Sequence, residues 1–145
     1  MIALASDHAG FAYKERVKTT LAEMGLPFTD FGAHSNESSD YPDFGHAAAT
    51  AVSKGECERG IFICGTGIGM SIVANKHKGV RAAACESVEA AELSRRHNNA
   101  NVLCIGERLT TWEEAQAIVR AFLKNEFEGG RHERRVGKIH SLTSC

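Results

Sequence analysis

The stretch from residue 61 to residue 70, Ile61-Phe62-Ile63-Cys64-Gly65-Thr66-Gly67-Ile68-Gly69-Met70, decides the fold of this chain. Its apolar start is typical of a strand buried in a parallel sheet. Cys64 ends that strand, glycine then recurs at every second position, and a helical pattern begins near Met70. Ligands of open α/β sheets bind beyond the carboxyl ends of the strands, so the stretch predicts a reactive thiol beside an anion cradle. Unpaired N–H groups at the helix start would stabilise both a bound anion and a thiolate.

Outward from this stretch, strand and helix patterns alternate along the chain. Strands are expected at residues 2–5, 28–31, 60–64, 80–84 and 102–105. Helices are expected after each of them: one closed by Gly25, one from Pro42 to Gly55, one from about 70 to 78, one ending near Arg96, and one opened by a capping box at 111–114. This alternation predicts a single doubly wound, Rossmann-like α/β domain over residues 1–145, with a five-stranded parallel sheet and helices on both faces.

The tail after Gly129-Gly130 differs from the rest of the chain. Residues 130–145 predict a last short helix, in which Arg131 and Arg135 lie four residues apart and share a face. The tail has little apolar content of its own, so we expect it to dock on another surface, such as a partner subunit. The alternative is a solvated charged face.

Composition excludes several classes of protein. Lysine and arginine number 17 and aspartate and glutamate 18, which gives no reason to expect nucleic acid or a membrane surface as partner. No apolar run approaches the roughly 20 residues of a membrane span, and residues 1–8 lack the pattern of a signal peptide. Five cysteines without a Cys-x-x-Cys pair favour reduced thiols and a cytoplasmic location over a disulfide framework or a zinc site.

Chemically useful side chains follow the predicted strands and helices, and we expect them to collect on one rim of the sheet. They are Asp7 and His8, Tyr41, Cys64, His97 and Asn98, and Arg108. Each has a purely structural alternative: Cys64 as an inert buried thiol, Asp7 as a helix N-cap, and His97 as a cation at a helix C-terminus. The other histidines, His34, His46, His77 and His140, show no pattern of partners, and no metal-ligand spacing is present.

The glycine loop has three possible meanings. A dinucleotide fingerprint needs Gly-x-Gly-x-x-Gly, but here the third glycine comes one residue early, at Gly69, and the loop follows the third strand. A nucleotide P-loop needs Gly-Lys-Ser/Thr at its end, which is missing. An oxyanion cradle needs only donors and room, so we favour the cradle.

Several motifs together resemble the type B ribose-5-phosphate isomerase family, which includes the galactose-6-phosphate isomerase subunits. The resemblance runs nearly end to end and rests on residues 6–10 (Ser-Asp-His-Ala-Gly), 40–42 (Asp-Tyr-Pro), 64–69 (Cys-Gly-Thr-Gly-Ile-Gly), 74–76 (Ala-Asn-Lys), 94–98 (Ser-Arg-Arg-His-Asn), 129–132 (Gly-Gly-Arg-His) and 135–136 (Arg-Val). One branch of the family places a glutamate base at the position of Met70. This chain has Cys64 and Met70 and so matches the cysteine branch.

The resemblance implies interconversion of ribose 5-phosphate and ribulose 5-phosphate through a cis-enediolate, as in the pentose phosphate pathway, without cofactor or metal. It implies that Cys64 is the base, that the N–H groups of Gly65, Thr66, Gly67, Ile68 and Gly69 hold the oxyanion, and that Thr66 passes a proton to or from a substrate oxygen. His97 would open the furanose ring, and Asp7 would orient a neighbouring group. Asp7, Tyr41 and Asn98 would grip hydroxyls, while His8, Arg108, Arg131 and Arg135 would meet the phosphate.

The resemblance further implies a homodimer or homotetramer with shared sites, in which His97, Asn98 and the arginine tail face the Cys64 of the partner. Two alternatives stay open. The first is an isomerase of a six-carbon sugar phosphate, such as allose or galactose 6-phosphate. The second is a non-catalytic sugar-phosphate binding module, which would need the glycine loop but neither a thiolate nor a ring-opening histidine.

Overall fold

The computed structural model describes residues 1–145 as alternating strands and helices around one parallel sheet. The strands are β1 (Ile2–Ser6), β2 (Phe28–Asp30), β3 (Arg59–Cys64), β4 (Ala82–Ala84) and β5 (Val102–Gly106). The helices are η1 (His8–Gly10), α1 (Phe11–Glu23), α2 (Tyr41–Ser53), α3 (Ile68–Ala74), α4 (Val88–Arg96), α5 (Trp112–Lys124) and α6 (Arg131–Thr143). The expected single α/β domain is confirmed. No helix combines the length and the apolar run that crossing a bilayer would require.

Two elements are shorter than the sequence predicts. The strand expected at 80–84 begins at Ala82, because the N–H of Val80 closes a turn onto His77 O and that of Arg81 donates to Asn101 Oδ1. The helix expected to reach residue 78 ends at Ala74. Beyond it, Lys76 and His77 donate to carbonyls three residues back, which tightens the chain into turns.

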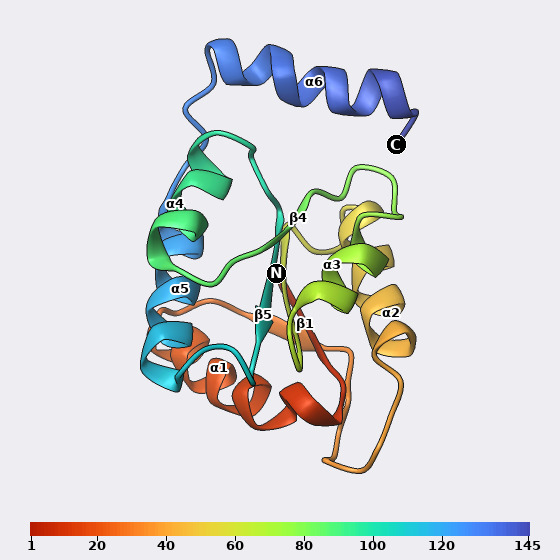
Figure 1. Ribbon diagram of the computed structural model, residues 1–145, viewed down its shortest axis with the longest axis vertical. Coiled ribbons are helices and arrows are strands. Elements are labelled where there is room, and N and C mark those ends of the chain that lie inside the picture. The colour runs from red at the N-terminus through yellow and green to blue at the C-terminus, as the bar shows by residue number, and fades with distance from the viewer.

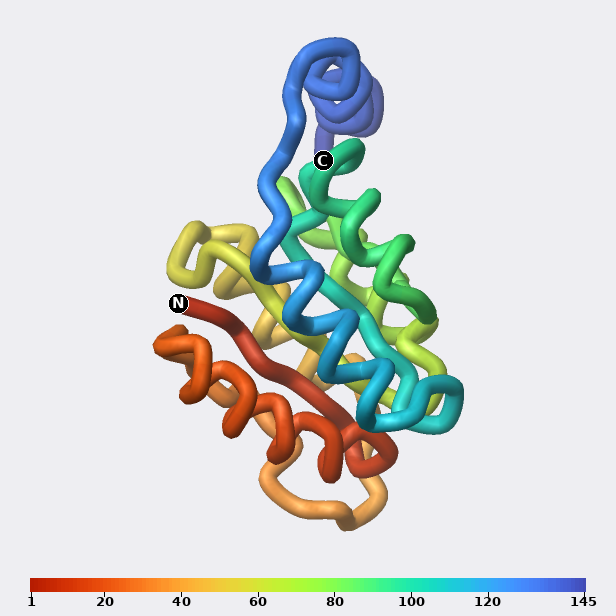
Figure 2. The backbone as a smooth tube through the Cα atoms, turned by 90° about the vertical axis from the view of Figure 1, so that its left-hand side faces the viewer, coloured from red at the N-terminus to blue at the C-terminus, as the bar shows by residue number.

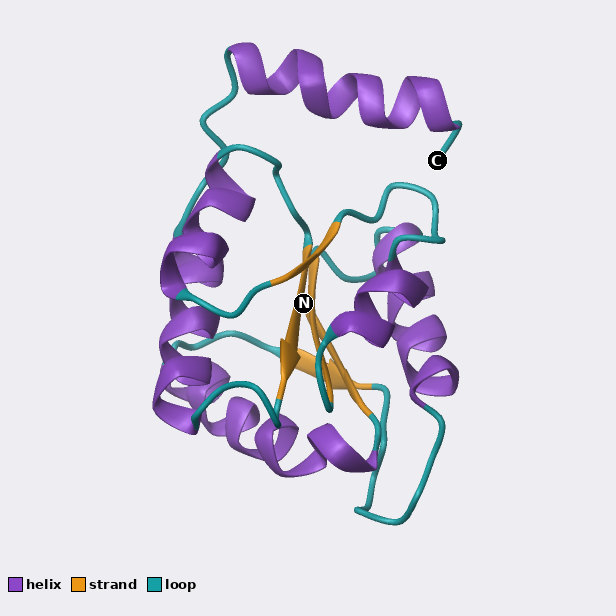
Figure 3. Cartoon of the chain, viewed as in Figure 1, coloured by secondary structure: helices purple, strands orange, loops and turns teal.

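The sheet has the strand order β2-β1-β3-β5-β4, with all pairs parallel. One face is covered by α1, α4 and α5 and the other by α2 and α3, as Figure 1 and Figure 3 show. Side chains alternate between the two cores: Ile61 and Ile63 of β3 face the first, whereas Phe62 and Cys64 face the second. Cys64 therefore lies on the side of the sheet that α2 and α3 cover.

The carboxyl ends of β1 and β3 form the switch point of the fold. From β1 the chain turns outward to β2 at one edge, and from β3 it crosses to β4 at the other edge. The two strands pair in register, with Ser6 opposite Ile63, so the segments that follow them diverge from neighbouring points. A crevice at such a point is where open α/β sheets bind their ligands.

Helix α6 stands apart from the layers. In Figures 1 and 2 it crosses the end of the molecule that lies opposite the start of α1. Only His132 and Val136 of this helix are buried, while Ile139 and Leu142 are exposed. The chain thus leaves most of the helix uncovered, and docking of residues 130–145 on a partner remains a prediction.

Candidate active site

A cavity of about 440 Å³ opens at the switch point. Its lining comes from the segments after β1, β3 and β5 and from the first turn of α2: Asp7, His8, Ala9, Tyr41, Cys64, Gly65, Thr66, Ile68, Gly69, Ile72 and Arg108. The structure therefore brings together most of the side chains that the sequence places at the strand ends. Ile72, one turn after Ile68 on α3, is a lining residue that the sequence analysis did not name.

Cys64 ends β3 with its thiol almost enclosed. The residue is only 4% exposed, and the N–H of Gly67 donates to its Sγ at 3.2 Å. An N–H donor stabilises a charged sulfur more than a neutral one. Gly67 itself has a φ of +79°, and a Cβ there would lie 3.0 Å from the carbonyl carbon of Ile105. The loop therefore needs glycine at this position to bring its N–H onto the thiol.

The remainder of the glycine loop is packed against its neighbours. The hydroxyl of Thr66 accepts the N–H of Ile68 at 3.2 Å, which opens α3. A Cβ on Gly69 would lie 2.5 Å from Cζ of Tyr41, so the tyrosine ring rests on bare backbone. Because Gly67 and Ile68 already donate to Sγ and Thr66, the N–H groups in the first turn of α3 that remain for a ligand are those of Gly69 and Met70.

Asp7 and His8 are held by the backbone around them. Asp7 Oδ1 caps η1 by accepting the N–H of Gly10 at 3.1 Å, which confirms the N-cap interpretation and leaves Oδ2 for a ligand. The N–H of His8 donates to Ser39 Oγ at 3.1 Å, and Ser39 N–H lies 3.1 Å from His8 Nδ1. The loop before α2 therefore orients the imidazole, a role of Ser39 that the sequence analysis missed.

Arg108 lies against the glycine loop, and contacts of its neighbour Glu107 hold the segment after β5 in place. Its N–H donates to Gly65 O at 3.0 Å, and a Cβ on Gly65 would lie 3.1 Å from a guanidinium nitrogen. The neighbouring Glu107 accepts the N–H of Tyr13 at 2.8 Å, in the first turn of α1. This carboxylate ties the loop after β5 to α1 and fixes where Arg108 projects.

The expectation that His97 and Asn98 share this rim within one chain is wrong. His97 is the C-cap of α4, and Asn98 lines a different cavity, beside Val80 and α6. The physical reason is direction: a helix that follows a parallel strand runs back along the sheet, so its C-terminus reaches the amino ends of the strands. The arginines Arg131 and Arg135 are exposed on α6, near His97 and away from the Cys64 cavity.

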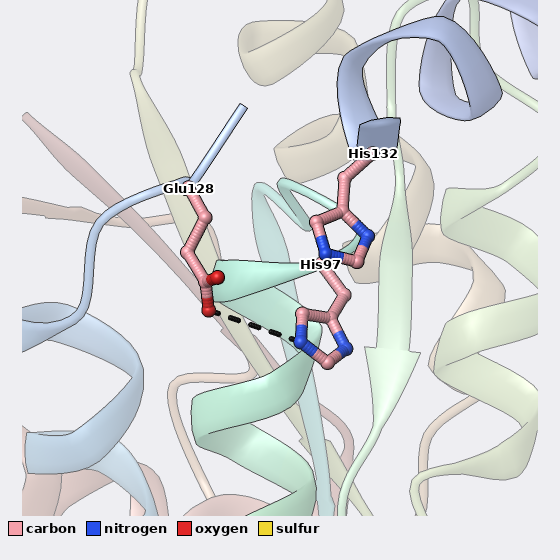
Figure 4. Close-up of side chains that lie close together, drawn as sticks. All are labelled: His97, Glu128 and His132. Carbon is pink, nitrogen blue, oxygen red and sulfur yellow. Dashed lines mark ion pairs between the residues drawn. The ribbon is translucent and has the colours of Figure 1, made fainter. Parts of the chain in front are cut away.

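His97 lies in a cluster that the sequence did not predict (Figure 4). Its ring stacks on that of His132, with centroids 4.2 Å apart and planes 10° from parallel. Glu128 Oε1 lies 3.8 Å from His97 Nε2. Burial and the nearby charges of His97, Arg131 and Arg135 lower the pKa of His132, against a smaller opposing effect of Glu128. The only sequence signal was the place of His132 beside Arg131.

Comparisons with known proteins agree along nearly the whole chain. Residues 2–139 match the family model described as Ribose/Galactose Isomerase. The chain is 45% identical over 141 residues to "Ribose-5-phosphate isomerase B" of Escherichia coli, covering 97% of this chain and 95% of that protein.

Solved structures agree as well. The Clostridium thermocellum ribose-5-phosphate isomerase B superposes with a TM-score of 0.96 at 51% identity, covering 99% of this chain and 97% of that one. The Mycoplasma genitalium ribose-5-phosphate isomerase B, with bound ribulose-5-phosphate, gives a TM-score of 0.94 at 43% identity, with coverages of 99% and 95%.

Proposed function

The chain belongs to the ribose/galactose isomerase family, and from this premise we propose that it interconverts ribose 5-phosphate and ribulose 5-phosphate. The observation that carries the proposal is the N–H of Gly67 on Cys64 Sγ, inside a cavity that also holds Arg108 and His8. A base, an anion cradle and groups for a phosphate are what aldose–ketose isomerisation of a sugar phosphate requires.

The proton transfer falls to Cys64. As thiolate it takes the proton from C2 of the open-chain aldose. The electron pair of that C–H bond forms the C1–C2 double bond, and the π pair of the C1 carbonyl moves onto its oxygen, which gives a cis-enediolate. The resulting thiol returns the proton to C1, which gives the ketose. A proton moves at the same time from the C2 oxygen to the C1 oxygen, and Thr66 at the mouth of the loop is the group we assign to it.

The remaining groups bind and orient the substrate. Within the glycine loop from Gly65 to Gly69, the N–H groups of Gly67 and Ile68 are already bonded, so we assign the developing oxyanion to those of Gly65, Thr66 and Gly69. One missing donor of this kind typically costs roughly a hundredfold in rate. Asp7 Oδ2 and the Tyr41 hydroxyl meet substrate hydroxyls, and His8 and Arg108 meet the phosphate, for which the guanidinium fork is well suited.

His97, Asn98, Arg131 and Arg135 act from a second subunit in this proposal. They lie away from the Cys64 cavity of their own chain, on the side where α6 is uncovered. In a homodimer, or a pair of dimers, His97 of one chain would open the furanose ring above the Cys64 of the other. Asn98 would hold a hydroxyl, and the two arginines would complete the phosphate site.

Steady-state turnover of ribose 5-phosphate in excess chelator tests the proposal, with Cys64→Ala as the matched variant. We expect wild-type turnover and a loss of roughly 10²-fold or more in the variant, because a positioned base contributes about that much. Ribulose 5-phosphate should still bind to Cys64→Ala. Wild-type-like turnover in that variant would exclude the thiolate as base. Turnover only on six-carbon sugar phosphates would show that the substrate is one of those. Binding of the sugar phosphate without turnover would favour the non-catalytic binding module.

A further inference from the structure

The strongest feature outside the Cys64 cavity is the cluster of His97, Glu128 and His132, shown in Figure 4. Its members come from the end of α4, the linker before α6 and the first turn of α6. Their nitrogen and oxygen atoms lie within 4.8 Å of one another. Two imidazoles and a carboxylate are ligands that zinc can take. The geometry of the two rings decides whether they could chelate a metal ion or instead support one another.

The stacked rings do not form a chelate. A zinc ion needs each nitrogen lone pair aimed at one point about 2.0–2.1 Å away. Ring nitrogens carry their lone pairs in the ring plane, and the two planes here are 10° from parallel at a centroid separation of 4.2 Å. The lone pairs of parallel rings run side by side and do not converge. The arrangement instead holds the two rings face to face, with the carboxylate at the edge of His97.

The chain holds this cluster from both sides. The linker is fixed to the end of α4 by Arg95, which donates to Asn125 O, and by Glu128, whose N–H donates to Arg96 O at 3.0 Å. Gly129 and Gly130 then take φ values of +70° and +57°, which turns the chain so that His132 lies over His97. His132 is 9% exposed, whereas the His97 side chain is 38% exposed. The buried ring is therefore the support and the accessible ring is the one that can meet a ligand.

We infer that His132 and Glu128 are positioning residues for His97: His132 fixes the plane of the His97 ring, and Glu128 stabilises the charged form of that ring. The inference rests on the proposed ring-opening role of His97, and it deepens that role.

Charges around the pair decide which ring takes a proton. Glu128 faces His97 from the linker, while Arg131 and Arg135 of α6 bring positive charge to the cluster. Arg96 of α4 is paired with Glu92 at 3.8 Å. Two charged rings about 4 Å apart would repel each other, so protonation of one opposes protonation of the other. Burial, the charge of His97 and the arginines lower the pKa of His132, so His132 is the ring that favours the neutral form, while Glu128 lies next to His97.

Histidine NMR titrations test the electrostatic part without any assay of activity. In Glu128→Gln the pKa of His132 should fall further, because the carboxylate no longer opposes the effect of burial and of the arginines. In His97→Phe the pKa of His132 should rise, because the stack remains and the opposing charge is gone. Glu126→Gln, an 82% exposed carboxylate of the same linker, is the control and should leave the pKa of His132 unchanged. An unchanged pKa of His132 in both test variants would overturn the pairing.

Rescue by an aromatic ring tests the positioning part. Ribose 5-phosphate is a furanose that must be opened before its C2 can lose a proton. His132→Ala should therefore lower kcat/KM for ribose 5-phosphate about tenfold or more, within the roughly 10²- to 10⁴-fold of a positioned proton donor. His132→Phe should restore most of the loss, because the ring still stacks. His140→Phe, on the same helix, should have no effect.

A His132→Phe variant as poor as His132→Ala would overturn the positioning role. His97→Asn separates this failure from failure of the proposed function. If His97→Asn turns over ribose 5-phosphate normally, then His97 does not open the ring, whatever the titrations show about the pair.

Discussion

At the scale of the residue, the site depends on glycines that let backbone approach reactive groups. Gly67 is the sharpest case, since its positive φ directs an N–H at Cys64 and its missing Cβ leaves room for the backbone of Ile105. Gly69 admits the Tyr41 ring in the same way. The alternating glycines that the sequence displays are therefore explained by close contacts as much as by an anion cradle.

Replacing Gly67 by alanine should damage both stability and activity. A left-handed conformation costs a non-glycine residue roughly 1–2 kcal/mol, and the contact with Ile105 adds an overpacking cost of about 1–3 kcal/mol. Displacing the loop by 1 Å would reduce kcat roughly 10²-fold. Urea unfolding and turnover of ribose 5-phosphate measure the two effects.

Gly55→Ala is the matched control for Gly67→Ala. Gly55 has nearly the same φ, +77°, but no atom lies within 4 Å of its added Cβ. Gly55→Ala should lower the free energy of unfolding only by the cost of the left-handed conformation, about 1–2 kcal/mol, and should leave kcat normal. Equal losses of stability in the two variants would show that the contact with Ile105 contributes nothing.

At the scale of the element, α1 and β2 are joined by a buried ion pair. Lys14 is completely buried, and its Nζ lies 2.6 Å from Asp30 Oδ2 at the end of β2. Lys18 lies 2.7 Å from the same oxygen, and Asp30 Oδ1 accepts the N–H of Gly32. Burial raises the pKa of Asp30, but the bonds from Lys14, Lys18 and Gly32 outweigh it and hold the pKa below its usual 3.8.

Asp30→Asn should lower the free energy of unfolding by about 3 kcal/mol at neutral pH, because it leaves the buried Lys14 without its closest partner. A carboxyl whose folded pKa is depressed adds stability above its unfolded pKa and loses it as pH falls through the folded pKa. The difference between wild type and variant should therefore be constant above about pH 5 and shrink below pH 3.8. Denaturant titrations across pH measure it.

The exposed Glu37 provides the control for Asp30→Asn, since Glu37→Gln should change stability by less than about 0.5 kcal/mol. A stability difference for Asp30→Asn that did not shrink in acid would contradict the assignment to the ion pair.

At the scale of the whole molecule, the candidate site groups lie at two ends of the sheet. Asp7, Tyr41 and Cys64 lie at the carboxyl edge, and His97 and α6 lie at the other end of the molecule. Within one chain these two sets do not meet. If both sets act on one substrate, as proposed above, the site is shared between two chains.

Mixing two inactive variants tests this arrangement. In a hybrid dimer of Cys64→Ala and His97→Asn chains, one of the two shared sites keeps both residues intact. Random assembly makes half the dimers hybrid, so co-refolded chains should recover about a quarter of the wild-type activity on ribose 5-phosphate. Cys64→Ala mixed with His8→Ala is the control, because both residues line one cavity and no site becomes whole. Failure of the first pair to recover would contradict shared sites.

The sequence alone determined the elements and which side chains gather at the carboxyl edge. The signals for the elements are local, because each acts through the backbone of its own neighbours; they are the apolar periodicity, Gly25, Gly55, Pro42 and the capping box. The helix and strand bounds in the structure agree with these signals to within a few residues. Parallel strands also place their carboxyl ends together. Asp7, Cys64 and Arg108 could therefore be assigned to one cavity without coordinates.

The tertiary structure decided what depends on direction and on contacts across the chain. His97 follows a helix, whereas Cys64 ends a strand, so the two residues lie at opposite ends of the sheet. Three contacts join segments that no periodicity in the sequence relates: those of Ser39 with His8, of Lys14 with Asp30 and of His132 with His97. Such contacts are set by how helices pack back onto the sheet, and that packing is a property of the folded chain as a whole.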